Sequence, residues 1–264
     1  MTEITFRQAL QRGLREALDA DPDVFLMGED IGKYDGAYAV TQGLLEKYGP
    51  DRIRDTPISE AAFVGAGVGA AVAGLRPVVE LMSMSFSLVA SDQIVNMAAK
   101  IRYMSGGQVK VPMVLRAPTG GGVQLAATHS QSFENWYAST PGLKVVTPST
   151  PYDALGLLRS SIEDDNPVIF AENALLYGTR GEVPDEEFRV PIGLADVKRE
   201  GSDITMVGWG HGIITLLDAA DKLAETGVKA EVIDLRTLRP LDMDTVTESV
   251  EKTGRALVLD ENRR

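Results

Sequence analysis

Asp55-Thr56-Pro57-Ile58-Ser59-Glu60 precedes fifteen uncharged, mostly small residues, Ala61 to Leu75, and this stretch decides the fold. The apolar run predicts a helix, with Ser59 as its N-cap and Glu60 in the first turn, where the helix dipole favours a carboxylate. The run is shorter than the ~20 residues that a membrane span needs. We therefore expect a helix buried in protein, with one acidic group at its amino-terminal end.

Three glycines stand inside this predicted helix, at Gly65, Gly67 and Gly69. Glycine disfavours helix formation, so its repeated use indicates another constraint. Close approach of a second helix is the constraint that small residues at this spacing usually serve. The plain alternative for Glu60 is a carboxylate that only complements the helix dipole.

The amino-acid composition excludes several classes of protein and of functional site. The chain has 264 residues, 44% of them hydrophobic and 24% charged, as in ordinary globular proteins. Its net charge of -12 argues against nucleic acid or an anionic membrane as a partner. Cysteine is absent from the sequence, which excludes disulfides, thiolate metal sites and a cysteine nucleophile. Charged residues interrupt the first segment, so we expect a cytoplasmic enzyme.

Short β-branched runs alternate with helical patterns, which predicts an α/β fold with right-handed βαβ units on a mostly parallel sheet. The expected strands are Val24–Met27, Pro77–Leu81, Pro112–Arg116, Lys144–Thr147, Val168–Ala171, Ile204–Val207, Ala230–Ile233 and Ala256–Leu259. The expected helices cover residues 5–19, 60–74, 87–104, 151–163, 212–226 and 242–253.

The glycine, proline and acidic residues near 181–199 predict a linker between domains 1–180 and 200–264. The predicted second domain then has three strands and two helices, which form only a small hydrophobic core. The chain stops where another helix is expected, so we expect this domain to be incomplete or to lean on a partner.

Two other enzyme classes fit the sequence poorly. The glycine cluster Gly208–Gly212 has Ile213 where a dinucleotide-binding fingerprint needs its last glycine, so we interpret it as a strand-to-helix turn. The serine hydrolase elbow G-x-S-x-G is missing.

His129 lies in a polar stretch after a glycine-rich loop, so it is either a ligand-facing group or a structural histidine bonded to neighbouring hydroxyls.

Several motifs together resemble the β subunits of the thiamine-diphosphate-dependent decarboxylating component of 2-oxo-acid dehydrogenase complexes. The matching stretches, in order, are Gly28–Asp30, Tyr34–Tyr38, Asp55–Glu60, Tyr103–Gly107, His129–Gln131, Pro141–Val146, Asn166–Val168 and Asp234–Asp242. The resemblance implies a transketolase-like pyrimidine-binding domain followed by a smaller transketolase C-terminal-like domain.

The resemblance also implies the roles of individual residues. Glu60 matches the glutamate that bonds a ring nitrogen of thiamine diphosphate, and Ile58, Met82 and Phe86 match the lining of the pyrimidine pocket. His129 matches a histidine near the reacting carbon and the lipoyl arm. Positions that match a potassium site are Met113, Ser161, Ile162, Asp164 and Asn166.

The diphosphate end of the cofactor is not accounted for, since the chain has no Gly-Asp-Gly motif. The resemblance assigns magnesium and the diphosphate to an α subunit, in a heterotetramer of two α and two β subunits. A lipoyl-bearing acyltransferase is the implied second partner. Pyruvate is the expected substrate, with branched-chain 2-oxo acids and acetoin as alternatives. The alternative of another class is a non-catalytic assembly subunit.

Overall fold

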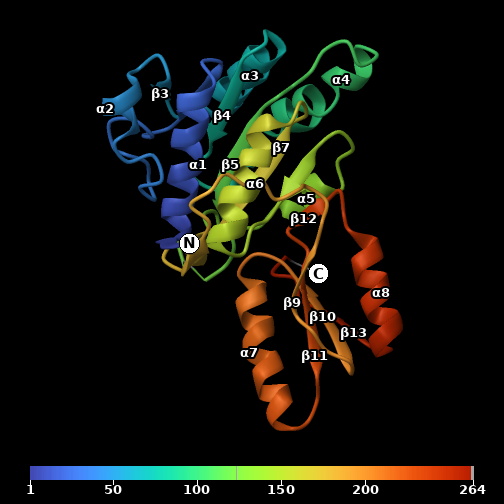
Figure 1. The fold of residues 1–264 in the computed structure, drawn as a ribbon. Helices are drawn as coiled ribbons and strands as arrows, with labels where there is room; N and C mark the ends of the chain where they lie inside the picture. The colour runs from blue at the N-terminus through green and yellow to red at the C-terminus, as the bar shows by residue number, and fades with distance from the viewer. Residues whose placement is uncertain (123, 263–264) are drawn as a thin grey trace.

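The computed structural model describes residues 1–122 and 124–262, which form a larger and a smaller α/β unit (Figure 1). In the larger sheet the strand order is β12-β6-β7-β5-β4-β2-β3, and all neighbours pair in parallel except β12 with β6. The strands are β2 (Val24–Gly28), β3 (Ile53–Asp55), β4 (Arg76–Glu80), β5 (Val114–Thr119), β6 (Lys144–Val146), β7 (Val168–Asn173) and β12 (Thr237–Arg239).

Helices cover both faces of this sheet, as the alternating pattern predicts. On one face α1 (Phe6–Ala20) packs against α6 (Pro151–Glu163). The other face carries α3 (Glu60–Val72), the π-helix η2 (Gln93–Ala98) and α5 (Glu134–Ala138). Each face has its own apolar core, because successive strand residues point to opposite sides.

The smaller sheet has the strand order β13-β10-β11-β9, flanked by α7 (Gly212–Glu225) and α8 (Met243–Thr253). Its strands are β9 (Asp196–Arg199), β10 (Ile204–Gly208), β11 (Ala230–Asp234) and β13 (Ala256–Val258). The expectation of three strands was wrong. The fourth, β9, pairs antiparallel with β11 and is too short and polar to show as an apolar run.

The segment predicted as a linker contains strands at both ends. Besides β9 it holds β8 (Arg180–Val183), which pairs with the amino-terminal strand β1 (Thr2–Thr5). Strand β12 then crosses from the carboxyl-terminal part to pair with β6 of the larger sheet. The two units therefore share backbone hydrogen bonds as well as side-chain contacts.

Local sequence explains where the long helices begin and end. Thr5 and Gln8 form a reciprocal capping box at the start of α1, and the Thr150 hydroxyl accepts from the Asp153 amide at the start of α6. Helix α8 begins with the Asp242 side chain as its cap and ends at Gly254 in the left-handed conformation.

The expectation of one continuous helix over 87–104 was wrong. The structure has three short pieces there: the 3₁₀ helix η1 (Met84–Leu88), the π-helix η2 and α4 (Ile101–Met104). The spacing of apolar residues in the sequence does not distinguish the hydrogen-bond patterns of 3₁₀, π and α helices. The other short helices are α2 (Leu44–Tyr48) and the 3₁₀ helix η3 (Ala174–Leu176). None of the helices in the described ranges has the length and apolar character for a bilayer crossing.

Helix α3 begins at Glu60 as predicted, with Ser59 in the cap position. The expected cap bond was wrong, since the Ser59 side chain makes none. Gly67 is the residue that allows close packing inside the chain: a Cβ there would lie 2.6 Å from Val79 of β4. Close approach at this glycine therefore involves the sheet and not a second helix.

Candidate active site

The candidate site lies along one edge of the larger sheet, where β2, β3 and β4 end. Glu29 directly follows β2, Glu60 begins α3 after β3, and Met82 follows β4. These strands are parallel, so their carboxyl ends meet at the same edge. Ligands of open α/β sheets bind at this edge.

Two carboxylates meet there. The Glu60 side chain is only 6% exposed, and so is that of Glu29. Burial raises the pKa of Glu29, and the nearby Glu60 carboxylate raises it further. One oxygen of Glu29, Oε1, is buried without a hydrogen-bond partner. A buried carboxyl group with a raised pKa is typical of acid–base sites.

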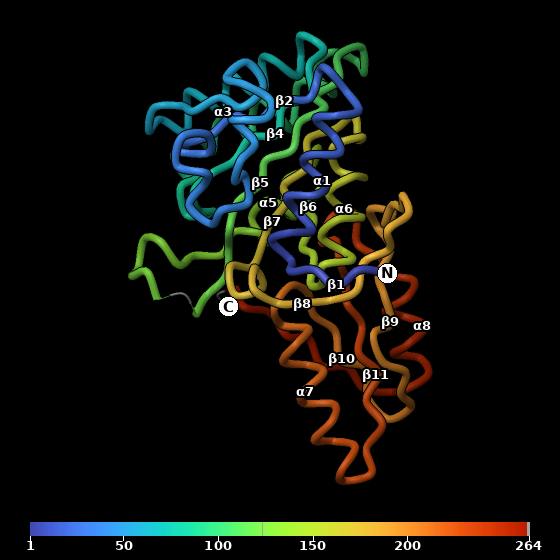
Figure 2. Tube along the Cα trace, turned by 60° about the vertical axis from the view of Figure 1, so that its left-hand side comes forward, coloured from blue at the N-terminus to red at the C-terminus, as the bar shows by residue number. Residues whose placement is uncertain are grey.

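Two of the predicted site residues bring their rings together. The rings of Phe86 and His129 meet edge to face with centroids 5.1 Å apart. His129 is exposed, and its Nδ1 lies 2.9 Å from the Thr128 hydroxyl. Phe86 is half-buried, so the two rings form a partly open aromatic surface. The loop that carries His129, between β5 and α5, projects from the body of the protein in Figure 2.

The remaining predicted pocket residues differ in exposure. Met82 is half-buried, whereas Ile58 is 85% exposed. Ile58 therefore lies on the surface, two residues before the buried Glu60.

A buried charge network supports the same edge. Arg116 of β5 donates to both oxygens of Glu172 at 2.7 Å and also pairs with Glu80 at the end of β4. The Tyr177 hydroxyl donates to Glu172 at 2.7 Å, and its ring packs against Tyr38. Burial raises the pKa of Glu80, although Arg116 acts in the opposite direction. The network joins β4, β5 and β7 through buried ion pairs.

The outer face of α3 is apolar and uncovered in this chain. Its exposed residues include Ala62, Ala66, Gly69 and Val72. The expectation that this helix is buried was therefore wrong for one chain alone. A Cβ at Gly69 would meet nothing within 4 Å, whereas one at Gly65 would lie 3.0 Å from Gln93 of the same chain. Of Gly65, Gly67 and Gly69, Gly69 is thus the one with open space beside its backbone in this chain.

The five predicted potassium positions come together near the end of α6. The carbonyls of Ile162 and Asp164 both accept from the Arg76 guanidinium, at 3.0 and 3.3 Å. The Asp164 carboxylate pairs with Lys144, and the Asn166 amide oxygen accepts from Arg102 at 2.5 Å. The Met113 carbonyl accepts from the Val168 amide at 2.9 Å, and the Ser161 hydroxyl donates to the Leu157 carbonyl at 2.7 Å. Basic side chains already hold much of this oxygen set, so it does not fit a free cation in the present arrangement.

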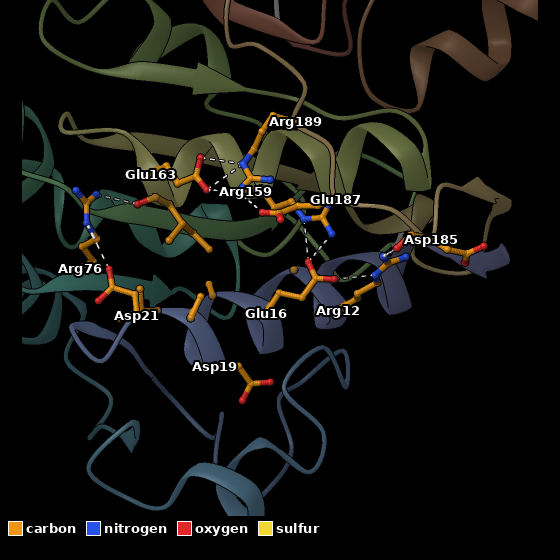
Figure 3. Close-up of a pocket in the computed structure, with 15 residues that line it drawn as sticks. Arg12, Glu16, Asp19, Asp21, Arg76, Arg159, Glu163, Asp185, Glu187 and Arg189 are labelled. Atoms are coloured by element: carbon orange, nitrogen blue, oxygen red, sulfur yellow. Dashed lines mark hydrogen bonds and ion pairs between the residues drawn. The ribbon is translucent and has the colours of Figure 1, made fainter. Parts of the chain in front are cut away.

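A large cavity lies elsewhere. It has a volume of about 720 Å³ between α1, α6 and residues 185–189 (Figure 3). Its arginines are engaged with acidic neighbours: Arg159 with Glu16, and Arg189 with Glu163 and Glu187. The cavity lies on the α1 face of the sheet, away from α3, so we do not assign the active site to it.

Comparison with known proteins decides the family. Residues 2–179 match the transketolase pyrimidine-binding domain and residues 193–264 the transketolase C-terminal domain. The chain is 52% identical over 263 residues to the mitochondrial pyruvate dehydrogenase E1 component subunit beta-1 of Arabidopsis thaliana, covering 98% of this chain and 72% of that protein. It is 51% identical to the corresponding subunit of Rhizobium meliloti, covering 99% of this chain and 57% of that protein.

The chain belongs to the family of pyruvate dehydrogenase E1 β subunits. A solved split-gene transketolase, described as an inactive β4 tetramer, matches with a TM-score of 0.81 over 98% of this chain and 80% of its own. At 24% identity it supports the fold alone. The transketolase-like architecture predicted from the sequence is confirmed.

Some residues of this E1 β-type site escaped the sequence analysis. Glu29 and the Arg116 network were not singled out for a role. A signal for Glu29 exists, because it is a carboxylate that directly follows a strand buried at every position. No comparable signal marks Arg116, whose partners come from distant parts of the chain.

Proposed function

We propose that this chain provides the pyrimidine-binding half of an active site that decarboxylates pyruvate on thiamine diphosphate and passes the acyl group to a lipoyl arm. The observation that carries the proposal is the Glu60 carboxylate. It is buried at the ligand-binding edge of the sheet, next to Glu29 and at the start of α3. The relatives named above favour pyruvate over branched-chain 2-oxo acids and acetoin.

The donor set fits the pyrimidine end of the cofactor. When bound, thiamine diphosphate supplies the electron sink for decarboxylation. Glu60 has a carboxylate oxygen to accept a hydrogen bond from a ring nitrogen and to hold a proton there. The Glu60 carboxylate lies close enough to raise the pKa of Glu29. Phe86, Met82 and Ile58 would contact the ring and exclude water from it.

We place His129 at the acyl-transfer step. Among the hydrogen bonds of the described residues, its ring takes part only through Nδ1 to Thr128. Nε2 is then the nitrogen that can meet an acyl acceptor, and the contact with Phe86 links that position to the pyrimidine pocket.

The diphosphate end requires a partner subunit. We propose an α subunit that holds magnesium and the diphosphate, in a heterotetramer of two α and two β subunits. The uncovered face of α3 around Gly69 is the surface for close helix packing. A lipoyl-bearing acyltransferase is the proposed acceptor partner. The isolated chain should then bind thiamine diphosphate weakly, and micromolar binding by titration calorimetry would contradict the split site.

Two finer expectations remain predictions. A potassium ion near Asp164 requires the Arg76 guanidinium to leave the two carbonyls it holds. A cytoplasmic location is also a prediction, because relatives of 52% and 51% identity are mitochondrial and bacterial respectively.

The decisive experiment replaces Glu60 in the reconstituted α/β enzyme. Glu60→Gln keeps the size of the side chain but cannot hold the proton. We expect assembly to survive and turnover of pyruvate to fall by about 10² to 10⁴, the usual worth of a positioned acid–base group. Glu46→Gln, an exposed change of the same type on α2, is the matched control.

Exchange of the thiazolium proton into deuterated water, followed by NMR after acid quench, gives a direct readout. Undiminished exchange in the Glu60→Gln enzyme would restore the interpretation of Glu60 as a helix-dipole residue. Activity on branched-chain 2-oxo acids or acetoin in place of pyruvate would correct the substrate. If the unmutated pair binds no thiamine diphosphate, the chain is an assembly subunit.

A further inference from the structure

A small cavity lies between the two units, at the end of β7 and away from Glu60. Its volume is about 10 Å³, room for one water-sized particle. Thr119, Glu134 and Thr147 line it from the larger unit, and Glu261 and Asn262 from the segment after β13. Polar oxygen atoms from both units therefore face one small space.

Two of these oxygens have no partner. Glu134 is 4% exposed; its Oε1 accepts from the Thr119 hydroxyl at 2.6 Å, but its Oε2 is buried without a hydrogen bond. The Asn262 Oδ1 is also buried and unpartnered, while its amide nitrogen donates to Asp260 at 2.8 Å. Buried acceptors left in this state cost stability, so a missing donor or cation is indicated.

The charges around the cavity favour a cation over a neutral molecule. Burial raises the pKa of Glu134, and Glu261 and Asp260 raise it further. Glu261 itself accepts from the Asn173 amide at 3.0 Å, and His211 Nδ1 lies 3.5 Å from its other oxygen. Among the described residues that line the cavity, lysine and arginine do not occur.

We propose that this cavity binds one monovalent metal cation, sodium or potassium, between the Glu134 carboxylate and the Asn262 amide oxygen. Monovalent ions suit this set, because carboxylate, amide and hydroxyl oxygens are hard ligands. The described residues contain no group of three or more His, Cys, Asp or Glu side chains arranged to hold a metal ion. The proposed ligands are therefore one buried carboxylate together with amide and hydroxyl oxygens. The residues are different from those of the predicted potassium site near Asp164.

The bound cation would link the larger unit to the smaller one. Glu134 is the first residue of α5 and follows the loop that carries His129, whereas Asn262 follows the last strand of the smaller sheet. Binding therefore restrains the base of that loop against the smaller unit. This role does not depend on the proposed decarboxylation.

The first test is amide hydrogen exchange of residues 124–138 in the complete chain. Sodium or potassium chloride is compared with choline chloride at equal ionic strength, which removes general screening. At ten times its dissociation constant, a cation that binds only the closed form slows exchange by about tenfold. Glu134→Gln should abolish the slowing, whereas Glu225→Gln, an exposed change of equal charge on α7, should retain it.

The second test needs no variant. Crystals of the complete chain soaked in rubidium chloride should give an anomalous difference peak between Glu134 and Asn262. No peak there, together with equal exchange in sodium, potassium and choline salts, would overturn the proposal. A proton or another side chain would then neutralise Glu134. Equal slowing in the parent and Glu134→Gln chains would also overturn it.

Discussion

Replacement of Arg116 by methionine tests whether the buried charge network holds the active-site edge together. Arg116 is 1% exposed and lies between Glu80 and Glu172, both buried. Methionine fills much of the same volume but leaves two buried carboxylates without their cation. Breaking a buried pair in this way costs about 3–5 kcal/mol. At about 2–4 °C per kcal/mol for a chain of this size, the melting temperature should fall by about 6–20 °C.

Calorimetry on the parent and variant chains measures this fall. Arg180→Met is the matched control, because its pair with Glu3 is exposed and worth at most about 1 kcal/mol. Adding Glu80→Gln and Glu172→Gln to Arg116→Met should recover much of the loss, since the unpaired charges disappear. A loss below about 1 kcal/mol, or no recovery in the triple variant, would refute the reasoning.

The pH dependence of this loss has a defined sign. Burial raises the pKa of Glu80 in the folded state, so the folded chain binds a proton that the unfolded chain releases. Stability from this group therefore falls as the pH rises through the folded pKa. Without Arg116 the pKa of Glu80 rises further, so the deficit of Arg116→Met should be smaller near pH 5 than near pH 8. An equal deficit at both values would contradict the assignment.

Three further changes probe other parts of the chain. Gly69→Leu should block assembly with the α subunit and leave the fold intact, because a side chain there meets nothing within this chain; normal sedimentation of the mixed subunits would contradict this. His129→Ala should impair transfer to the lipoyl acceptor more than decarboxylation with an artificial electron acceptor, and equal loss would make it a general binding residue. Burial raises the pKa of Asp234 to about 6, so the stability contributed by this group should fall between about pH 4 and 6 as the folded state loses its extra proton. Asp234→Asn should flatten that part of the curve in urea unfolding, and an unchanged slope would count against this pKa.

The parts of the fold that follow from local pattern were predictable. Helix α1 has apolar residues at helical spacing and a capping box, and the parallel strands are continuous apolar runs. Strands β9 and β12 were not predictable, because they are short, polar and paired antiparallel with partners far along the chain. Such strands exist because tertiary pairing satisfies their backbone, and their side chains carry little signal.

The candidate site divides in the same way. Glu60 was identifiable from a carboxylate before an apolar helix, and its burial agrees with that placement. Glu134 gave no signal, because its environment comes from Thr119, Asp260 and Glu261, which only the fold brings near it. A buried carboxylate is thus visible in sequence when its own helix buries it, and hidden when distant segments do.

In the proposed function, helix α3 takes part in both assembly and chemistry. Its inner face packs on the sheet through Gly67, its first residue is the buried Glu60, and its outer face around Gly69 is uncovered. A partner that packs on the outer face therefore bears on the same rigid helix that positions the carboxylate. Ile58, two residues before Glu60, is 85% exposed. If Glu60 and the outer face of α3 act as we propose, cofactor binding and assembly should be lost together when α3 is altered at Gly69.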